Sequence, residues 1–242
     1  MSVSYNLLLA LLLLAPGFGV YAGIYLGSQT GRIQFPPPAP GSVFTLAIVT
    51  IGSVAAHLVG VLIFAAEERI CAITSACIAT HWEPNAYRVL LVASQPNGAR
   101  GPEQIAAVLM VLVVLTALAF VLAYLVTEGL TRLKTFRGLI YGWLAETAVA
   151  EDRNEIVVAY ILSDVEAEGT TVGYSGAIHN LKINADKEIT TIVLSDCEVF
   201  YLRVDKRGVR QYDAAGYEVL SRLYLERARI KNINFERVRI GP

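Results

Sequence analysis

The chain has 242 residues, of which 55% are hydrophobic and 17% are charged, and its mean hydropathy is +0.51. Soluble domains carry about 25% charged residues, so this composition argues against an ordinary soluble protein. The net charge of −1 excludes a chain that binds polyelectrolytes through its overall charge, and three cysteines are too few for a disulfide scaffold.

Three long stretches of the sequence carry no charged side chain. They cover residues 1–31, 33–66 and 104–127. Each contains an apolar core of at least the roughly 20 residues that cross a bilayer as a helix. We therefore predict transmembrane helices over residues 6–27, 43–66 and 104–127. The first is not expected to be a cleaved signal peptide, because "MSVSYN" has no basic residue and the apolar run continues past any cleavage position.

Small residues recur at every fourth position in the first two predicted helices. These positions are Gly19, Gly23 and Gly27 in the first helix, and Gly52, Ala56 and Gly60 in the second. Four residues is just over one helical turn, so each set lies on one face of its helix. Helices in lipid associate by close backbone packing, which small residues permit. We predict that both sets are helix-packing residues, with the two helices in contact with each other or with a partner. The alternative is a pore-lining face in an oligomer.

Three further features of the predicted helices carry expectations. The third helix is rich in Leu and Val and has few small residues, so we expect it to face lipid. In the first helix, Pro16 removes a backbone hydrogen bond and predicts either a kink or a short non-helical entry. In the second, His57 is the only strongly polar side chain well inside a predicted span. We expect it to be neutral and hydrogen-bonded to a neighbouring helix.

The segments between the helices suggest how the chain is oriented. Basic residues flank the spans on two sides of the predicted membrane: Arg69, Arg88 and Arg100 on the first, and Arg32, Arg132, Lys134 and Arg137 on the second. Basic flanks favour the cytoplasm, and the second side has four basic residues against three on the first. We therefore predict that the N-terminus lies outside and that the C-terminal domain, which is on the second side, is cytoplasmic. The run "FPPPAPG" in the 28–42 loop predicts a polyproline strut. It would brace the helices or touch the C-terminal domain, and recognition by a partner is the alternative.

The sequence changes character after the third helix, which divides the chain into a transmembrane domain (1–131) and a second domain (132–242). An amphipathic helical segment covers residues 133–149. Five strand-like runs follow, separated by turn signals, at residues 155–165, 170–183, 188–204, 217–225 and 228–240. A helix followed by five strands in about 100 residues predicts a small, strongly bent β-barrel. The expected fold is therefore a membrane α + β protein with a cytoplasmic five-stranded barrel.

This plan resembles the Sm-like and SH3-like small barrels. The whole chain is similar to an uncharacterised class of bacterial three-span membrane proteins, through the segments "LLLLAPGFGVY", "YSGAIHNLKI" and "IKNINFERV". The resemblance implies the bacterial inner membrane and a C-terminal small barrel, but no activity or site residues. Mechanosensitive channels also combine three spans with a small barrel, but their pore helix is rich in Gly and Ala, whereas the third helix here is not.

Charge is divided unevenly along the second domain. From Glu146 to Glu198 there are eleven acidic and three basic residues, and from Arg203 to Arg239 there are ten basic and five acidic residues. The two halves either neutralise each other, within one domain or between neighbours, or present a basic face to an anion such as a nucleotide or a lipid headgroup. The candidate anion- or partner-binding residues are Arg203, Lys206, Arg207, Arg210, Arg227, Arg229 and Lys231.

No sequence motif of a known catalytic chemistry is present: there is no nucleophile elbow, Walker loop, dinucleotide fingerprint or zincin motif. We therefore predict no catalytic residues, no cofactor, no metal and no enzyme activity. The expected function is that of an assembly, scaffold or accessory subunit of a membrane complex, with the lipid bilayer and a protein or a second copy as partners. The alternative is an oligomeric, ligand-gated membrane effector or pore of the antiviral-defence type, which senses an anionic nucleotide through its basic C-terminal half. Nucleic acid is not an expected partner.

Overall fold

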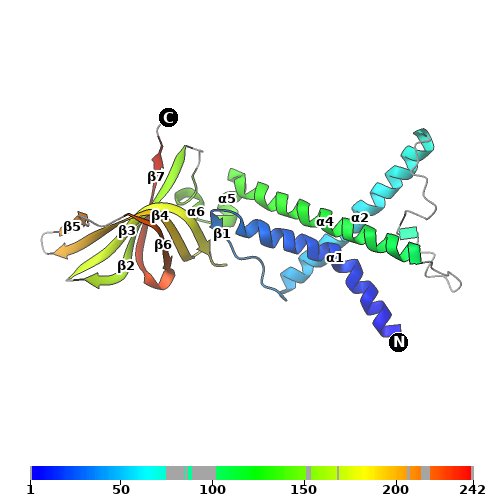
Figure 1. Cartoon of the computed structure of the whole chain (residues 1–242), viewed down its shortest axis with the longest axis horizontal. Helices are drawn as coiled ribbons and strands as arrows, with labels where there is room; N and C mark the ends of the chain where they lie inside the picture. The colour runs from blue at the N-terminus through cyan, green and yellow to red at the C-terminus, as the bar shows by residue number, and fades with distance from the viewer. Residues whose placement is uncertain are drawn as a thin grey trace. The chain divides into compact units, whose positions relative to one another are not determined.

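The computed structural model describes residues 2–74, 85, 87–88, 102–150, 154–167, 169–205, 208–213 and 219–240. The chain divides into two compact units. The first comprises residues 1–27 and 37–127 and contains three long helices. The second comprises residues 28–36 and 128–242 and contains a seven-stranded sheet with short helices (Figure 1).

The three long helices are α1 (Ser2–Gln29), α2 (Val43–Thr74) and α4 (Pro102–Arg132). The windows Ala10–Gln29, Val43–Ile73 and Glu103–Arg132 are long and apolar enough to cross a membrane, as expected of an integral membrane protein. Large apolar side chains stay exposed along these helices, including those of Val43, Ile51, Leu62, Val113 and Leu122. Such a surface suits hydrocarbon rather than water. The helices predicted at these three places are confirmed, and each is longer than predicted.

Helix α1 continues through Pro16 and bends midway along its length (Figure 1). Proline has no N–H, so the carbonyl of Leu12 loses its usual donor four residues along the helix. The Pro16 side chain is fully buried. The bend that the sequence predicted is therefore present without a break in the helix.

The sheet is antiparallel except for one short strand. Its strands are β1 (Ile33–Gln34), β2 (Glu155–Ala167), β3 (Thr170–Ile183), β4 (Ile189–Asp205), β5 (Gly208–Asp213), β6 (Leu220–Glu226) and β7 (Ile230–Arg239). The strand order is β5-β4-β3-β2-β7, with β6 also paired to β4 and β1 paired in parallel to β3. The five predicted strands are present as β2, β3, β4, β6 and β7.

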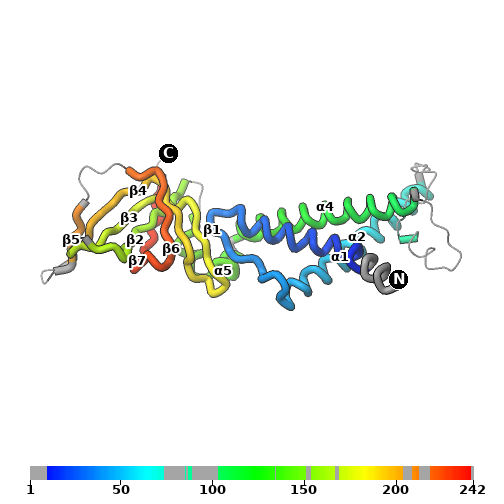
Figure 2. Tube along the Cα trace, turned by 60° about the horizontal axis from the view of Figure 1, so that its bottom comes forward, coloured from blue at the N-terminus to red at the C-terminus, as the bar shows by residue number. Residues whose placement is uncertain are grey.

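The prediction of a closed five-stranded barrel is wrong. A barrel needs hydrogen bonding between neighbouring strands all the way round. Here β6 pairs with β4 and β7 pairs with β2, and in the described part of the chain β6 and β7 do not pair with each other. The 3-10 turn Arg227–Arg229 carries the chain from one strand to the other, as can be followed in Figure 2. The turn thus takes the place of the ladder that would close a barrel.

Strand β5 falls in a region that the sequence predicted as a turn. Strand β3 accompanies β4 only as far as the pair Thr171–Leu202. On its other edge β4 pairs with β5, from Phe200–Asp213 to Asp205–Gly208, so this pairing overlaps the end of the β3 pairing and continues past it. Because β6 occupies the earlier part of the same edge of β4, β5 and β6 lie one after the other along it.

Strand β1 comes from the linker between α1 and α2. Its residues pair with Leu181 and Lys182 of β3, and the Leu181 N–H donates to the carbonyl of Arg32 at 2.8 Å. The sequence predicted that the run "FPPPAPG" would brace the helices or touch the C-terminal domain. Its Phe35 packs against the core of that domain, and its Pro38 carbonyl accepts a hydrogen bond from the Tyr21 hydroxyl of α1 at 2.9 Å. If the three helices span a membrane, the pairing of β1 with β3 requires the α1–α2 linker and the segment after α4 to emerge on the same side.

The core of the second unit lies between the curved sheet and two short helices, α5 (Lys134–Tyr141) and α6 (Leu144–Thr147). The sequence predicted one helical segment here, but Gly142, at φ +62°, ends α5 after two turns. Tyr141 and Leu144, on either side of this break, are both buried. Buried side chains of the core include Ile33, Val157, Ile161, Leu181, Ile192 and Leu194.

Candidate functional site

The glycines of α1 lie against α4. A Cβ atom added to Gly19 would lie 2.6 Å from the carbonyl oxygen of Thr116, and one added to Gly27 would lie 2.8 Å from the Cβ of Thr127. At Gly23 the added atom would meet the Phe120 carbonyl. The sequence expected this face to meet the helix over residues 43–66 or a partner, and the structure places it on the third helix instead. Helix α4 is therefore not solely a lipid-facing helix.

The contact between α1 and α2 uses a different set of residues. A Cβ at Gly17 would overlap the backbone carbonyl of Val49, and one at Gly52 would lie 3.0 Å from the side chain of Val20. Gly17 was not among the predicted packing residues, although its position directly after Pro16 marks it in the sequence. Ala56 is half-buried.

Gly60 of α2 makes room for a tyrosine. A Cβ at Gly60 would lie 2.5 Å from the Tyr87 hydroxyl and 3.2 Å from a methyl group of Leu115 in α4. Tyr87 belongs to a short described piece of the chain between α2 and α4, and its ring also meets Phe64 edge-on at 6.0 Å. This segment therefore returns to the side of α2.

A polar cluster surrounds the carbonyl of Leu13, close to the bend of α1. The Ser53 hydroxyl and His57 Nε2 of α2 both hydrogen-bond to it, the latter at 2.8 Å. His57 Nδ1 lies 3.0 Å from the Tyr87 hydroxyl, which also contacts the His57 carbonyl at 3.2 Å. Since a carbonyl only accepts, Nε2 carries a proton. The predicted hydrogen bond from His57 to a neighbouring helix is confirmed, and Tyr87 is a partner that the sequence did not identify.

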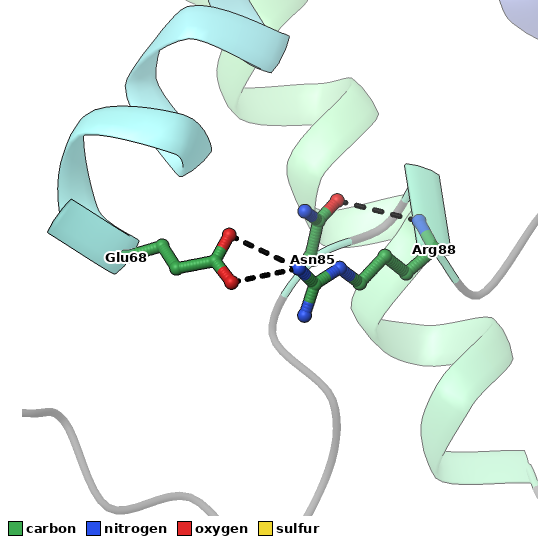
Figure 3. Close-up of polar contacts among 3 residues, drawn as sticks. All are labelled: Glu68, Asn85 and Arg88. Atoms are coloured by element: carbon green, nitrogen blue, oxygen red, sulfur yellow. Dashed lines mark hydrogen bonds and ion pairs between the residues drawn. The ribbon is translucent and has the colours of Figure 1, made fainter. Parts of the chain in front are cut away.

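An ion pair lies next to this cluster along the chain (Figure 3). Arg88 Nη2 lies 2.8 and 3.0 Å from the two carboxylate oxygens of Glu68, and the Asn85 side-chain oxygen accepts the Arg88 backbone N–H. The pair is exposed, with 53% and 63% of the side chains accessible. Exposed pairs contribute about 0–1 kcal/mol, so this contact orients the segment more than it stabilises it.

Much of the basic half of the second unit is engaged by the acidic half. Arg229 pairs with Asp164 at 3.1 Å and Lys231 pairs with Glu166 at 2.6 Å. The hydrogen bond from Lys231 lowers the pKa of the Glu166 carboxyl. Arg227 donates to the Ile230 carbonyl at 2.8 Å. The interpretation that the two halves neutralise each other within one domain therefore holds at these pairs.

Two of the predicted basic residues remain exposed on the β4–β5 hairpin. Arg203 and Arg210 are directly opposite each other, and neither forms an ion pair with any side chain in the described parts of the chain. The neighbouring pair on the same face is Tyr201 and Tyr212. Like charges in direct opposition destabilise a hairpin unless an anion lies between them. Lys206 and Arg207, which follow β4 in the sequence, lie outside the described residues.

A pocket of about 300 Å³ lies beside the 3-10 turn. Its lining includes Trp143, Glu188, Arg227, Lys231 and Asn232. Its charges are mixed, since Glu188 faces the same space as the two cations, and Lys231 is already paired. Trp143 and Arg227 line the same space, so it combines an aromatic ring on which a base can stack with a cation that can meet a phosphate.

The remaining polar groups of the described residues include one thiol and no metal-binding cluster. No group of three or more His, Cys, Asp and Glu side chains that could hold a metal ion occurs among the described residues. Cys197 is fully buried beside Gly176, and burial, with a smaller effect of Asp196, raises its pKa to about 11. A thiol that stays protonated at neutral pH is a poor nucleophile.

The sequence matches no protein-family model, and searches for similar curated proteins and similar solved structures find no match. The resemblance to bacterial three-span proteins and to Sm-like barrels therefore stays a prediction.

Proposed function

We propose that this chain is a non-enzymatic integral protein of a bacterial inner membrane that acts as an assembly, scaffold or accessory subunit of a membrane complex. The N-terminus would lie outside and the sheet domain in the cytoplasm. The observation that carries the proposal is the pairing of β1 with β3. Since both the α1–α2 linker and the segment after α4 enter the sheet domain, two chain connections tether it to the helices, which suits a protein that holds a partner at the membrane.

The β4–β5 hairpin is the part of the domain best suited to contact that partner. Arg203 and Arg210 stand in direct opposition, with the exposed Tyr212 beside them. Arginine and tyrosine are enriched where proteins bind one another. An acidic segment of a partner would relieve the repulsion between the two guanidinium groups, because it would place a carboxylate between them.

The experiment isolates the intact protein from its native membrane in mild detergent, measures the particle mass and identifies every component. The R203E/R210E double variant is compared with R222E, which changes an exposed arginine on β6 opposite Ser195. We expect wild type and R222E to retain the partner and the double variant to lose it. A wild-type particle with the mass of one chain would overturn the proposal.

The pocket beside Trp143 favours a second candidate function, that of an oligomeric, ligand-gated membrane effector. A nucleobase would stack on the Trp143 ring while a phosphate met Arg227. Against it, Arg229 and Lys231 are held in ion pairs with acidic residues. The test is leakage of dye from vesicles that contain the protein, with and without a panel of nucleotides. Nucleotide-dependent leakage that R227E abolishes would favour this candidate, and a flat response across the panel would exclude it.

A further inference from the structure

Helix α5 exposes apolar side chains on the side away from the core. The exposed fractions are 53% for Leu133, at the N-cap, 40% for Phe136, 73% for Leu139 and 53% for Trp143, just after the helix. Phe136 and Leu139 are three residues apart, so they share one side of α5. Four large apolar residues are thus exposed within an eleven-residue segment, which is unusual for a surface in water, and the Trp143 ring also meets that of Phe235 at 6.2 Å.

The opposite side of α5 fixes this orientation. Tyr141 is buried in the core of the sheet domain, and Arg137 donates to the carbonyls of Thr131 and Ala150. Lys187, in the β3–β4 turn, donates to the carbonyl of Leu139 at 2.7 Å. A cation at this end of a helix satisfies a carbonyl that the helix itself leaves open. The apolar patch cannot turn inward without breaking these bonds.

The patch begins where the membrane candidate α4 ends. Helix α4 closes at Arg132, and Leu133 is the next residue. Arg132 has 75% of its side chain exposed. A basic residue at the end of a span, followed by an amphipathic helix with a tryptophan, has the composition of a segment that lies in the headgroup region. In the sequence, the exposed apolar residues of α5 thus follow directly after those of α4.

We propose that α5 lies flat in the headgroup region of the bilayer that α4 crosses, with Phe136, Leu139 and Trp143 inserted at the boundary with the acyl chains. This inference rests on the proposed membrane insertion of the helices. The patch is the surface through which the sheet domain touches lipid, and Arg132, which is exposed although it is paired with Glu128, meets lipid phosphates. Because α5 is packed on the sheet domain through Tyr141, the same contact holds that domain against the membrane.

The test uses the full chain in vesicles of phosphatidylcholine and phosphatidylglycerol. The chain has two tryptophans, Trp82 and Trp143. The fluorescence difference between wild type and W143F therefore reports Trp143, and W82F gives the same signal by a second route. Quenchers are lipids brominated near the glycerol, lipids brominated near the acyl-chain end, and aqueous iodide. The control is Y224W in a W82F/W143F background, so that its single tryptophan replaces Tyr224, an exposed aromatic residue of β6.

We expect the emission of Trp143 to be blue-shifted. It should be quenched more by the lipids brominated near the glycerol than by those brominated near the acyl-chain end, and it should be shielded from iodide. The tryptophan of Y224W should be quenched by iodide. Iodide quenching of Trp143 as strong as in the control would overturn the inference. Shielding from iodide without bromolipid quenching would also overturn it, since a second copy would then cover the patch. Carbonate extraction separates the two proposals. A chain that leaves the vesicles contradicts membrane insertion itself, and one that stays with Trp143 unquenched contradicts only the placement of α5.

Discussion

Ile33 lies beside Leu181, although 148 residues separate them along the chain, and both side chains are buried in the core of the sheet domain. The relationship means that this domain is completed by two residues from the linker between the first two helices. The sheet is therefore complete only when the segment between α1 and α2 and the segment after α4 are both in place. We expect such a long-range contact to form late in folding, because its loop-closure entropy is large.

We predict that I33A destabilises the sheet domain by about 2–5 kcal/mol, the usual loss for a buried isoleucine that leaves a cavity. The matched control is I240A, the same chemical change at a residue that is 53% exposed, which should alter stability by less than about 0.5 kcal/mol. The measurement is thermal unfolding of the sheet by circular dichroism in detergent. Equal effects of the two substitutions would contradict the burial of β1 in the core.

The sequence identified the elements better than their contacts. Uncharged runs locate helices because the bilayer demands an apolar length, and alternation located five strands. The sequence could not predict which helix contacts Gly23. A row of small residues shows that one face of a helix packs closely, but it does not show against which helix. The absent barrel closure has a similar cause, since the sequence of residues 227–229 does not reveal whether the flanking strands pair. Tyr87 was missed as a partner of His57 because its contact depends on the path of an entire loop.

The α1–α4 contact yields a prediction at Gly23. We expect G23A to destabilise the helical unit by about 1–3 kcal/mol through overpacking, since the added methyl group would meet the Phe120 carbonyl and lie 2.9 Å from the Cβ of Ala123. G129A is the matched control, because no atom lies within 4 Å of a Cβ at that position of α4. The measurement is the helical unfolding transition in detergent. G23L should separate α1 from α4 more severely while the sheet domain stays folded, and survival of the contact in that variant would refute the packing role.

The hydrogen bonds of His57 predict coupling between α2 and the segment that contains Tyr87. In a double-mutant cycle of H57L and Y87F, we expect a coupling energy of about 0.5–2 kcal/mol, the range for such bonds in helical membrane proteins. S53A serves as a comparison, because Ser53 shares the Leu13 carbonyl with His57 but has no bond to Tyr87. Its coupling to Y87F should be near zero. Additive losses for H57L and Y87F would show that the contact between them contributes nothing.

Because Arg203 and Arg210 lie directly opposite each other, we predict that replacing one of them stabilises the sheet domain and weakens the binding of an acidic partner. Removing one charge with R210Q should stabilise the β4–β5 hairpin by about 0.2–1 kcal/mol, because like charges across a strand pair repel. The same variant should weaken the hold on an acidic partner. R222Q, which removes an exposed charge opposite Ser195, should do neither. Thermal unfolding and co-purification measure the two effects, and a loss of stability in R210Q would show that the arginines are held by groups of the chain itself.

Cys197 gives a prediction for pH. With a pKa of about 11 in the folded protein and about 8.5 when unfolded, the thiol stays protonated in the folded state while the unfolded state releases its proton. The unfolded state therefore binds fewer protons above pH 8.5, and the stability contributed by Cys197 falls as the pH rises from there towards 11.

At pH 8 roughly a quarter of unfolded thiols but only about one in a thousand folded ones would be ionised, so alkylation by iodoacetamide should be at least about a hundredfold slower in the folded protein. The measurement is mass spectrometry of the Cys197 peptide across this pH range, with C197A as the control for the stability change. Rapid alkylation of the folded protein at pH 8 would contradict the burial of this thiol against Gly176.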